Sequence, residues 1–100
     1  MNTIYLYQGD TGTGADAIIE NKDGPVDLTD ADVLFLFGDH VIYPIKQKEK
    51  GNVRLVFEDM HMEVACIFNA YFRVIWSDTR KETFPGPQLE PIKVHIKEMK

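Results

Sequence analysis

Three histidines are the first candidates for chemistry, because a neutral imidazole is a good ligand for zinc or copper. They stand far apart in the chain, at His40, His61 and His95. No pair has the spacing of a zinc or copper motif. We therefore interpret them as surface residues and predict no metal cofactor.

Four aspartates crowd one short region, at Asp23, Asp27, Asp30 and Asp32. Carboxylates on a turning loop are the ligands that calcium prefers. The spacing lacks the alternating acidic frame and the closing glutamate of a calcium loop. Aspartate side chains also cap turns by bonding nearby backbone N–H groups. We favour turns here, with calcium as the alternative.

Nucleophilic chemistry has little support in the sequence. Ser77 lies outside any Gly-x-Ser-x-Gly motif. Cys66 stands among apolar residues, which favours a small buried side chain over a reactive thiol. The glycines of residues 9–14 do not match a phosphate-binding loop and predict a turn. We predict no catalytic residues, no cofactor and no enzymatic activity, although the sequence does not exclude a carboxylate pair of the glycosidase type.

Length, composition and charge indicate the kind of domain that would carry any functional site. The chain has 100 residues, 44% of them apolar and 27% charged, with a formal charge of −5. These values predict one globular domain over residues 1–100. The acidic balance argues against nucleic acid as a partner. No apolar run is long enough to span a membrane and no leader precedes the first strand, so we expect no membrane insertion and synthesis in a cytoplasm.

Hydrophobic patterning indicates strands throughout. Residues 53–57 and 92–96 alternate apolar with polar, as a half-buried strand does. Residues 33–37 are continuously apolar after a Gly-Pro turn, which predicts a central strand buried on nearly both faces. Pro44 should end a strand or place it at an edge, and residues 58–63 fit either a helical turn or a long connection. The expected strands are residues 3–7, 15–20, 33–37, 41–45, 52–57, 67–76, 81–84 and 91–97. Seven or eight short strands separated by turns predict an all-β fold, an immunoglobulin-like antiparallel β-sandwich.

Tyrosines are the candidate interface residues. Tyrosine combines a large apolar ring with a polar hydroxyl and is enriched at protein interfaces. Core packing is the interpretation that we favour for the set, which also includes Trp76, and an interface is the alternative. The candidates are Tyr5, Tyr7, Tyr43 and Tyr71.

The order of short motifs resembles a known family. Gly9-Asp10-Thr11 follows the first strand, and residues 24–29 read Gly-Pro-Val-Asp-Leu-Thr before an apolar strand. Residues 69–74 form a Tyr-containing strand, and Thr83-Phe84-Pro85 precedes the closing strand. This order resembles the N-terminal domain of the upper baseplate protein of phages that infect Gram-positive bacteria. The family's glycine before the Tyr-containing strand is absent here, so we expect the turn into that strand to differ.

The resemblance implies a non-enzymatic module of a phage or prophage tail or baseplate, located in the virion. Such a module anchors a receptor-binding apparatus through contacts with other tail or baseplate proteins, as a homo-oligomer or a hetero-assembly. The motifs shape the fold and carry no catalytic or ligand residues. The alternatives are a small carbohydrate-binding or adhesion module that uses exposed tyrosines and, third, a small enzyme or enzyme inhibitor.

Overall fold

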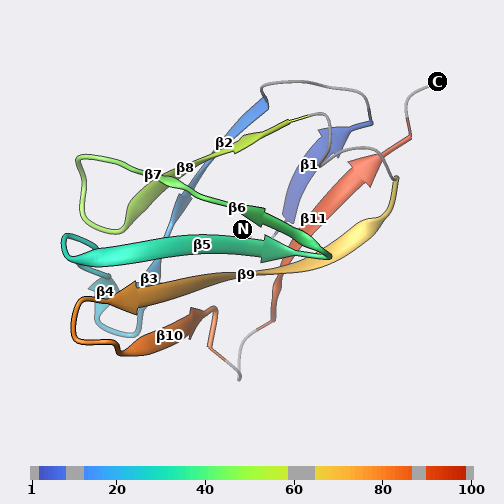
Figure 1. Ribbon diagram of the computed structural model, residues 1–100. Helices are drawn as coiled ribbons and strands as arrows, with labels where there is room; N and C mark the ends of the chain where they lie inside the picture. The colour runs from blue at the N-terminus through green and yellow to red at the C-terminus, as the bar shows by residue number, and fades with distance from the viewer. Residues whose placement is uncertain (1–2, 9–12, 59–64, 87–89, 99–100) are drawn as a thin grey trace.

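The computed structural model describes residues 3–8, 13–58, 65–86 and 90–98, which form strands, turns and loops. The strands make a six-stranded and a three-stranded sheet that pack face to face, beside a two-stranded one, so the predicted all-β sandwich is confirmed (Figure 1). The pattern-poor residues 59–63 and most of the glycine loop lie outside the described residues. Within the described residues, no helix is long and apolar enough to cross a membrane.

The large sheet has six strands in the order β1-β11-β9-β5-β6, with β10 also paired to β9. Its strands are β1 (Thr3–Tyr7), β5 (Ala31–Phe37), β6 (His40–Ile42), β9 (Ile67–Trp76), β10 (Lys81–Phe84) and β11 (Ile92–Lys97). β11 and β10 pair with successive halves of the same edge of β9, while β5 pairs with its other edge. β9 is therefore the strand that organises the large sheet.

The small sheet has the order β2-β8-β7, and a hairpin of β3 and β4 stands beside it. These strands are β2 (Thr13–Ile18), β3 (Glu20–Asn21), β4 (Gly24–Pro25), β7 (Ile45–Lys46) and β8 (Asn52–Phe57). The strand predicted over residues 41–45 is split into β6 and β7, which belong to different sheets. Pro44 lies in this crossing, where a residue without an N–H donor costs no ladder bond.

One pairing departs from the antiparallel pattern. β1 runs parallel to β11, with register from Thr3 opposite Lys93 to Tyr7 opposite Lys97. Among the described residues, the other strand pairs are antiparallel. Residues from the two ends of the sequence are thereby brought side by side in one sheet.

Phenylalanines fill the space between the sheets. Phe35 is fully buried and its ring lies 4.8 Å from that of Phe72 on the neighbouring strand. Across the core it meets Phe57 of the small sheet edge-on, at 6.3 Å between ring centroids. Phe37 packs against Phe57 at 5.8 Å and against Phe68 at 5.7 Å. Burying rings of this size is the main stabilising term for a domain of this length.

The strand over residues 33–37 is central, as predicted, but its two faces differ. Val33, Phe35 and Phe37 are buried in the core. Leu34 and Leu36 point to the opposite face of the sheet and are only half-buried. The continuous apolar run therefore supplies both the core and part of an outer surface.

Candidate functional site

The outer face of the large sheet carries three of the exposed tyrosines, Tyr5, Tyr7 and Tyr71. Residues paired across neighbouring strands lie on the same face of a sheet. Tyr5 of β1 pairs with His95 of β11, and His95 pairs with Ile67 of β9. Tyr71 lies four residues after Ile67 on β9 and therefore on the same face. The side chains of Tyr5, Ile67 and Tyr71 are 62%, 58% and 38% exposed. Strands β1 and β9, with β11 between them, thus present these side chains together on the face that points away from the core.

Cations share this face with the tyrosines. Lys93 and Lys97 alternate outward on β11, and Arg73 lies two residues beyond Tyr71 on β9. Lys81 of β10 joins them because it pairs with the outward-facing Ile75. Among the described positions of this face, these cations are accompanied by one carboxylate, Asp32 of β5. We call this surface the tyrosine–lysine face and define it by Tyr5, Ile67, Tyr71, Arg73, Lys93 and Lys97.

Local contacts hold the two lysines over the sheet. The Lys97 ammonium lies 4.9 Å from the centre of the Tyr5 ring, a cation–π arrangement. The Tyr5 ring also packs at 5.5 Å against the half-buried ring of His95. Lys93 Nζ donates a 2.9 Å hydrogen bond to Asn69 Oδ1. Within the described part of the chain neither lysine is in an ion pair.

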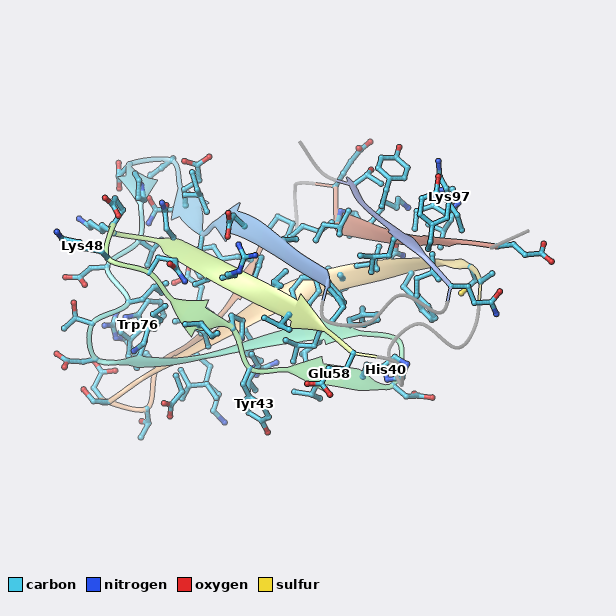
Figure 2. All side chains as sticks on the ribbon, turned by 90° about the horizontal axis from the view of Figure 1, so that it is seen from above. His40, Tyr43, Lys48, Glu58, Trp76 and Lys97 are labelled. Atoms are coloured by element: carbon cyan, nitrogen blue, oxygen red, sulfur yellow. The ribbon has the colours of Figure 1, made fainter. Side chains whose placement is uncertain are left out.

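The four predicted interface tyrosines do not form one cluster. Tyr5, Tyr7 and Tyr71 lie on the outer face of the large sheet, whereas Tyr43 lies in the crossing from β6 to β7. Tyr43 is 75% exposed and points away from the body of the molecule, apart from Lys97 (Figure 2). All four tyrosines are exposed, so the core packing that we favoured for them is wrong.

Trp76 is in a different situation from the tyrosines. It is half-buried and packs against the core cluster. The Arg80 guanidinium lies 4.9 Å from its ring centre. Trp76 is therefore part of the packed domain, and its outer side is covered by a cation.

The histidines and the cysteine lie apart. His40 packs at 5.1 Å against the ring of Phe37, whereas His95 contacts Tyr5, and His61 is outside the described residues. Cys66 lies in the bend before β9 and is half-buried, whereas a buried side chain was predicted. In the described residues, no group of three or more His, Cys, Asp or Glu side chains could hold a metal ion.

Asp27 serves a turn, as predicted, whereas Asp32 lies in strand β5 and not in a turn. Asp27 Oδ1 accepts hydrogen bonds from the backbone N–H of Thr29 at 3.0 Å and from its hydroxyl at 2.6 Å. These bonds to the Thr29 hydroxyl and N–H hold the pKa of the exposed Asp27 carboxyl below its usual value. The carboxylate is engaged by its own backbone.

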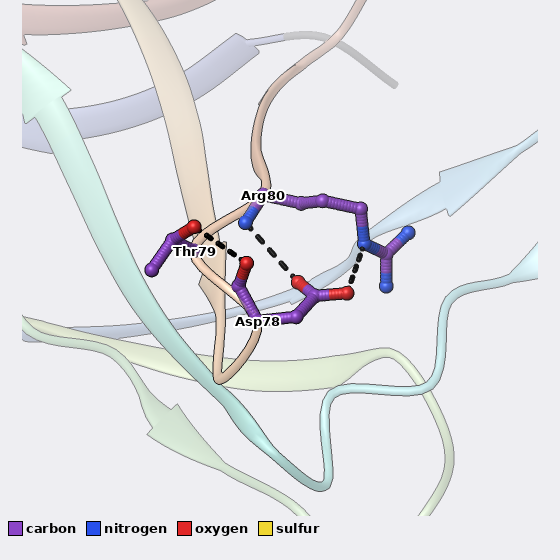
Figure 3. A network of polar contacts seen from close by, with 3 residues as sticks. All are labelled: Asp78, Thr79 and Arg80. Carbon is purple, nitrogen blue, oxygen red and sulfur yellow. Dashed lines mark hydrogen bonds and ion pairs between the residues drawn. The ribbon is translucent and has the colours of Figure 1, made fainter.

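A second aspartate turn joins β9 to β10. Asp78 accepts hydrogen bonds from the Arg80 N–H at 3.1 Å and from Arg80 Nε at 2.8 Å (Figure 3). These two bonds, the backbone one foremost, lower the pKa of the Asp78 carboxyl. Between them, Thr79 adopts a left-handed backbone with φ 71° and its hydroxyl donates to the Asp78 carbonyl. The network fixes the turn that places Arg80 over Trp76.

Two shallow hollows lie near the small sheet. The larger, of about 520 Å³, has Ala17 and Val53 among its apolar lining and Glu20, Gln47 and Asn52 among its polar lining. The smaller, of about 360 Å³, lies between residues 27–29 and the loop of residues 46–52. Neither hollow is lined by a tyrosine or tryptophan, so neither offers the ring platform on which a sugar stacks.

Sequence reasoning missed the grouping of the cations with the tyrosines. The alternation of β11 already turns Lys93 and Lys97 to one side. Nothing local shows that this side faces the same way as Tyr5 and Tyr71, because that depends on the pairing of strands far apart in sequence. The acidic balance of the whole chain also concealed a positively charged face.

Comparisons of the chain with protein-family models and with curated proteins find no match.

Proposed function

We propose that the chain is a non-enzymatic structural module of a phage or prophage tail or baseplate, which anchors a receptor-binding apparatus through protein–protein contacts. The observation that carries the proposal is the open outer face of the large sheet, where Tyr5, Ile67 and Tyr71 are exposed together. Aromatic residues on a surface are characteristic of protein interfaces. The motif order around residues 24–29 and 83–85 supports the baseplate assignment by resemblance.

The shape of this surface supports a protein partner over a sugar. The tyrosines stand on a sheet face that spans β1, β11 and β9, and the two hollows near the small sheet contain no aromatic ring. A sugar-binding site needs a ring next to amide or carboxylate groups in a concave surface. A protein can cover a broad sheet face without a groove.

Mass spectrometry of purified phage particles tests the proposal. Particles induced from the strain that encodes the chain should contain it in a constant ratio to the tail-tube protein across preparations. Its release with the baseplate on mild dissociation of the tail would support the location. Particles that lack the chain while carrying all other tail proteins would overturn the proposal.

A further inference from the structure

We infer that the tyrosine–lysine face binds an acidic protein surface, in which carboxylates surround an apolar centre. The inference rests on the proposed function for its setting, since it names the chemistry of the partner that the module would contact. The chemistry of the partner itself is argued from the charge, the exposure and the dimensions of the face. Those three properties follow from residues of the paired strands β1, β11, β9, β10 and β5.

Charge is the first argument. Among the described residues, Arg73, Lys81, Lys93 and Lys97 lie on the outer face of the large sheet with a single carboxylate, Asp32, although the whole chain carries a formal charge of −5. The described part of this face is therefore positively charged on an acidic molecule. Complementary charge steers association and suppresses wrong partners.

The state of the lysines is the second argument. The ammonium of Lys97 is held over the Tyr5 ring and that of Lys93 is held by Asn69, an arrangement that keeps both near the sheet. Neither contact neutralises the charge. A carboxylate from a partner can add to each lysine without breaking an existing ion pair, and the side chains lose less rotamer freedom than extended lysines would.

Apolar surface between the cations is the third argument. Ile67 and Tyr71 are exposed, and Leu36 beside Tyr71 is half-buried on the same face. A polyanion such as nucleic acid offers no apolar surface to cover these side chains along its backbone, whereas a protein surface does. The mixture of aliphatic side chains and cations therefore favours a folded acidic protein.

The size of the face and the charge repulsion between two identical copies limit further which protein can bind there. Five strands about 4.8 Å apart and a ten-residue β9 give the whole outer face of the large sheet dimensions of roughly 20 by 33 Å, close to one partner's share of a standard interface. The tyrosine–lysine face is the part of it on β1, β11 and β9. A second copy that docked by the same face would bring its own Arg73, Lys93 and Lys97 against these cations. Like charges in direct opposition are destabilising, so we expect a different protein there.

The first test uses the purified chain and a defined probe, a glutamate-rich copolymer of glutamate and tyrosine. We expect binding that weakens as salt rises from about 0.05 M to about 0.5 M, because screening shortens the reach of the charges. Lys93→Glu with Lys97→Glu should weaken binding by about tenfold or more. The matched control, Lys48→Glu with Lys50→Glu, makes the same charge change in an exposed loop and should alter binding less than about twofold.

Several results of this test would overturn the inference. Equal losses in both double variants would mean that only net charge matters. Tighter binding of a single-stranded oligonucleotide than of the copolymer would indicate a polyanion site. A concentration-dependent increase in mass that Lys93→Glu with Lys97→Glu abolishes would indicate a second copy of the chain. Unchanged far-ultraviolet circular dichroism and melting temperature establish that each variant is folded.

The second test uses the chain in its particle. A zero-length carbodiimide cross-linker joins amines only to carboxylates in contact, so in purified particles it should link Lys93 or Lys97 to an Asp or Glu of another protein. Cross-links from Lys48 or Lys50 alone would contradict the inference while leaving the proposed function intact. Particles without the chain would overturn the proposed function, and the copolymer experiment would still decide the chemistry of the face.

Discussion

The inner and outer faces of the large sheet are made by the same strands and differ in chemistry. On β9 the inner positions include Phe72, which is buried against Phe35, and the outer positions include Tyr71 and Arg73, which are exposed. Burial of the inner-face side chains stabilises the folded chain. The outer face keeps apolar surface and charge exposed, and it is there that we propose a partner binds. Alternate residues along β9 therefore belong either to the buried core or to this exposed surface.

The largest expected effect comes from breaking the inner face. Phe35→Ala removes a fully buried ring that contacts Phe37, Phe57 and Phe72, and should lower the free energy of unfolding by about 3–5 kcal/mol. Urea denaturation followed by the fluorescence of the single tryptophan, Trp76, measures the change.

The neighbour on the other face provides the control for that variant. Leu36→Ala alters the same strand at a half-buried outward position and should cost about 1 kcal/mol, because less surface is lost from contact. Equal costs for Phe35→Ala and Leu36→Ala would show that the two faces do not differ in the way described.

An intermediate loss of stability should follow from substitution of Gly51, whose backbone packs closely against Ile19 and Pro25. Gly51 has φ +80°, and a Cβ there would lie 2.7 Å from the Ile19 carbonyl oxygen and 3.0 Å from Pro25 Cβ. Gly51→Ala should therefore cost about 2 kcal/mol through backbone strain and displacement of the β3–β4 hairpin. For a domain of this size that is a fall in melting temperature of roughly 8–16 °C.

Gly86 serves as the comparison for Gly51. It has no positive φ, and a Cβ there would meet nothing within 4 Å. Gly86→Ala should leave the melting temperature within about 3 °C of the parent value. A fall as large as that of Gly51→Ala would remove the packing explanation.

The smallest effect is expected at the exposed turn of Asp78. Its pKa is lowered in the folded chain by hydrogen bonds from Arg80, so the ionised form stabilises the fold above the unfolded-state pKa. That contribution disappears as the pH falls through the lowered folded-state pKa. The gap in melting temperature between the parent and Asp78→Ala should therefore narrow from about pH 7 to about pH 2.

Asp78→Asn refines this measurement. The amide oxygen can still accept a hydrogen bond from the Arg80 N–H but carries no charge. At neutral pH the melting temperature of the Asp78→Asn variant should therefore lie between those of the parent and of Asp78→Ala. A gap that stays constant across the pH range would mean that the turn depends on shape alone.

Local patterns predicted the strands that have one buried side. The alternation in β8 and β11 matches the burial of Val53, Leu55, Val94 and Ile96 in the core. Asp27 was predicted as a turn residue because the reach of its side chain to nearby backbone is a local property. Such strands and turns are determined by the size and polarity of residues that lie close together in the sequence.

Features that depend on distant pairing could not be predicted in this way. The pairing of β1 with β11 joins residues at opposite ends of the sequence, and no local pattern specifies it. The exposure of Tyr5 and Tyr71 and their grouping with Lys93 and Lys97 depend on the same register. Tyrosine in an alternating strand is equally compatible with either face, because its ring packs well and its hydroxyl tolerates water.

The parallel pairing of β1 with β11 also determines how the domain would carry a mechanical load. A force that draws the chain before Thr3 away from the chain after Lys97 acts at opposite ends of two strands that run the same way. The five register pairs between them are then sheared together and are not opened one after another. A link of this kind resists extension until several hydrogen bonds fail at once, a useful property in an assembly that passes force from one component to the next.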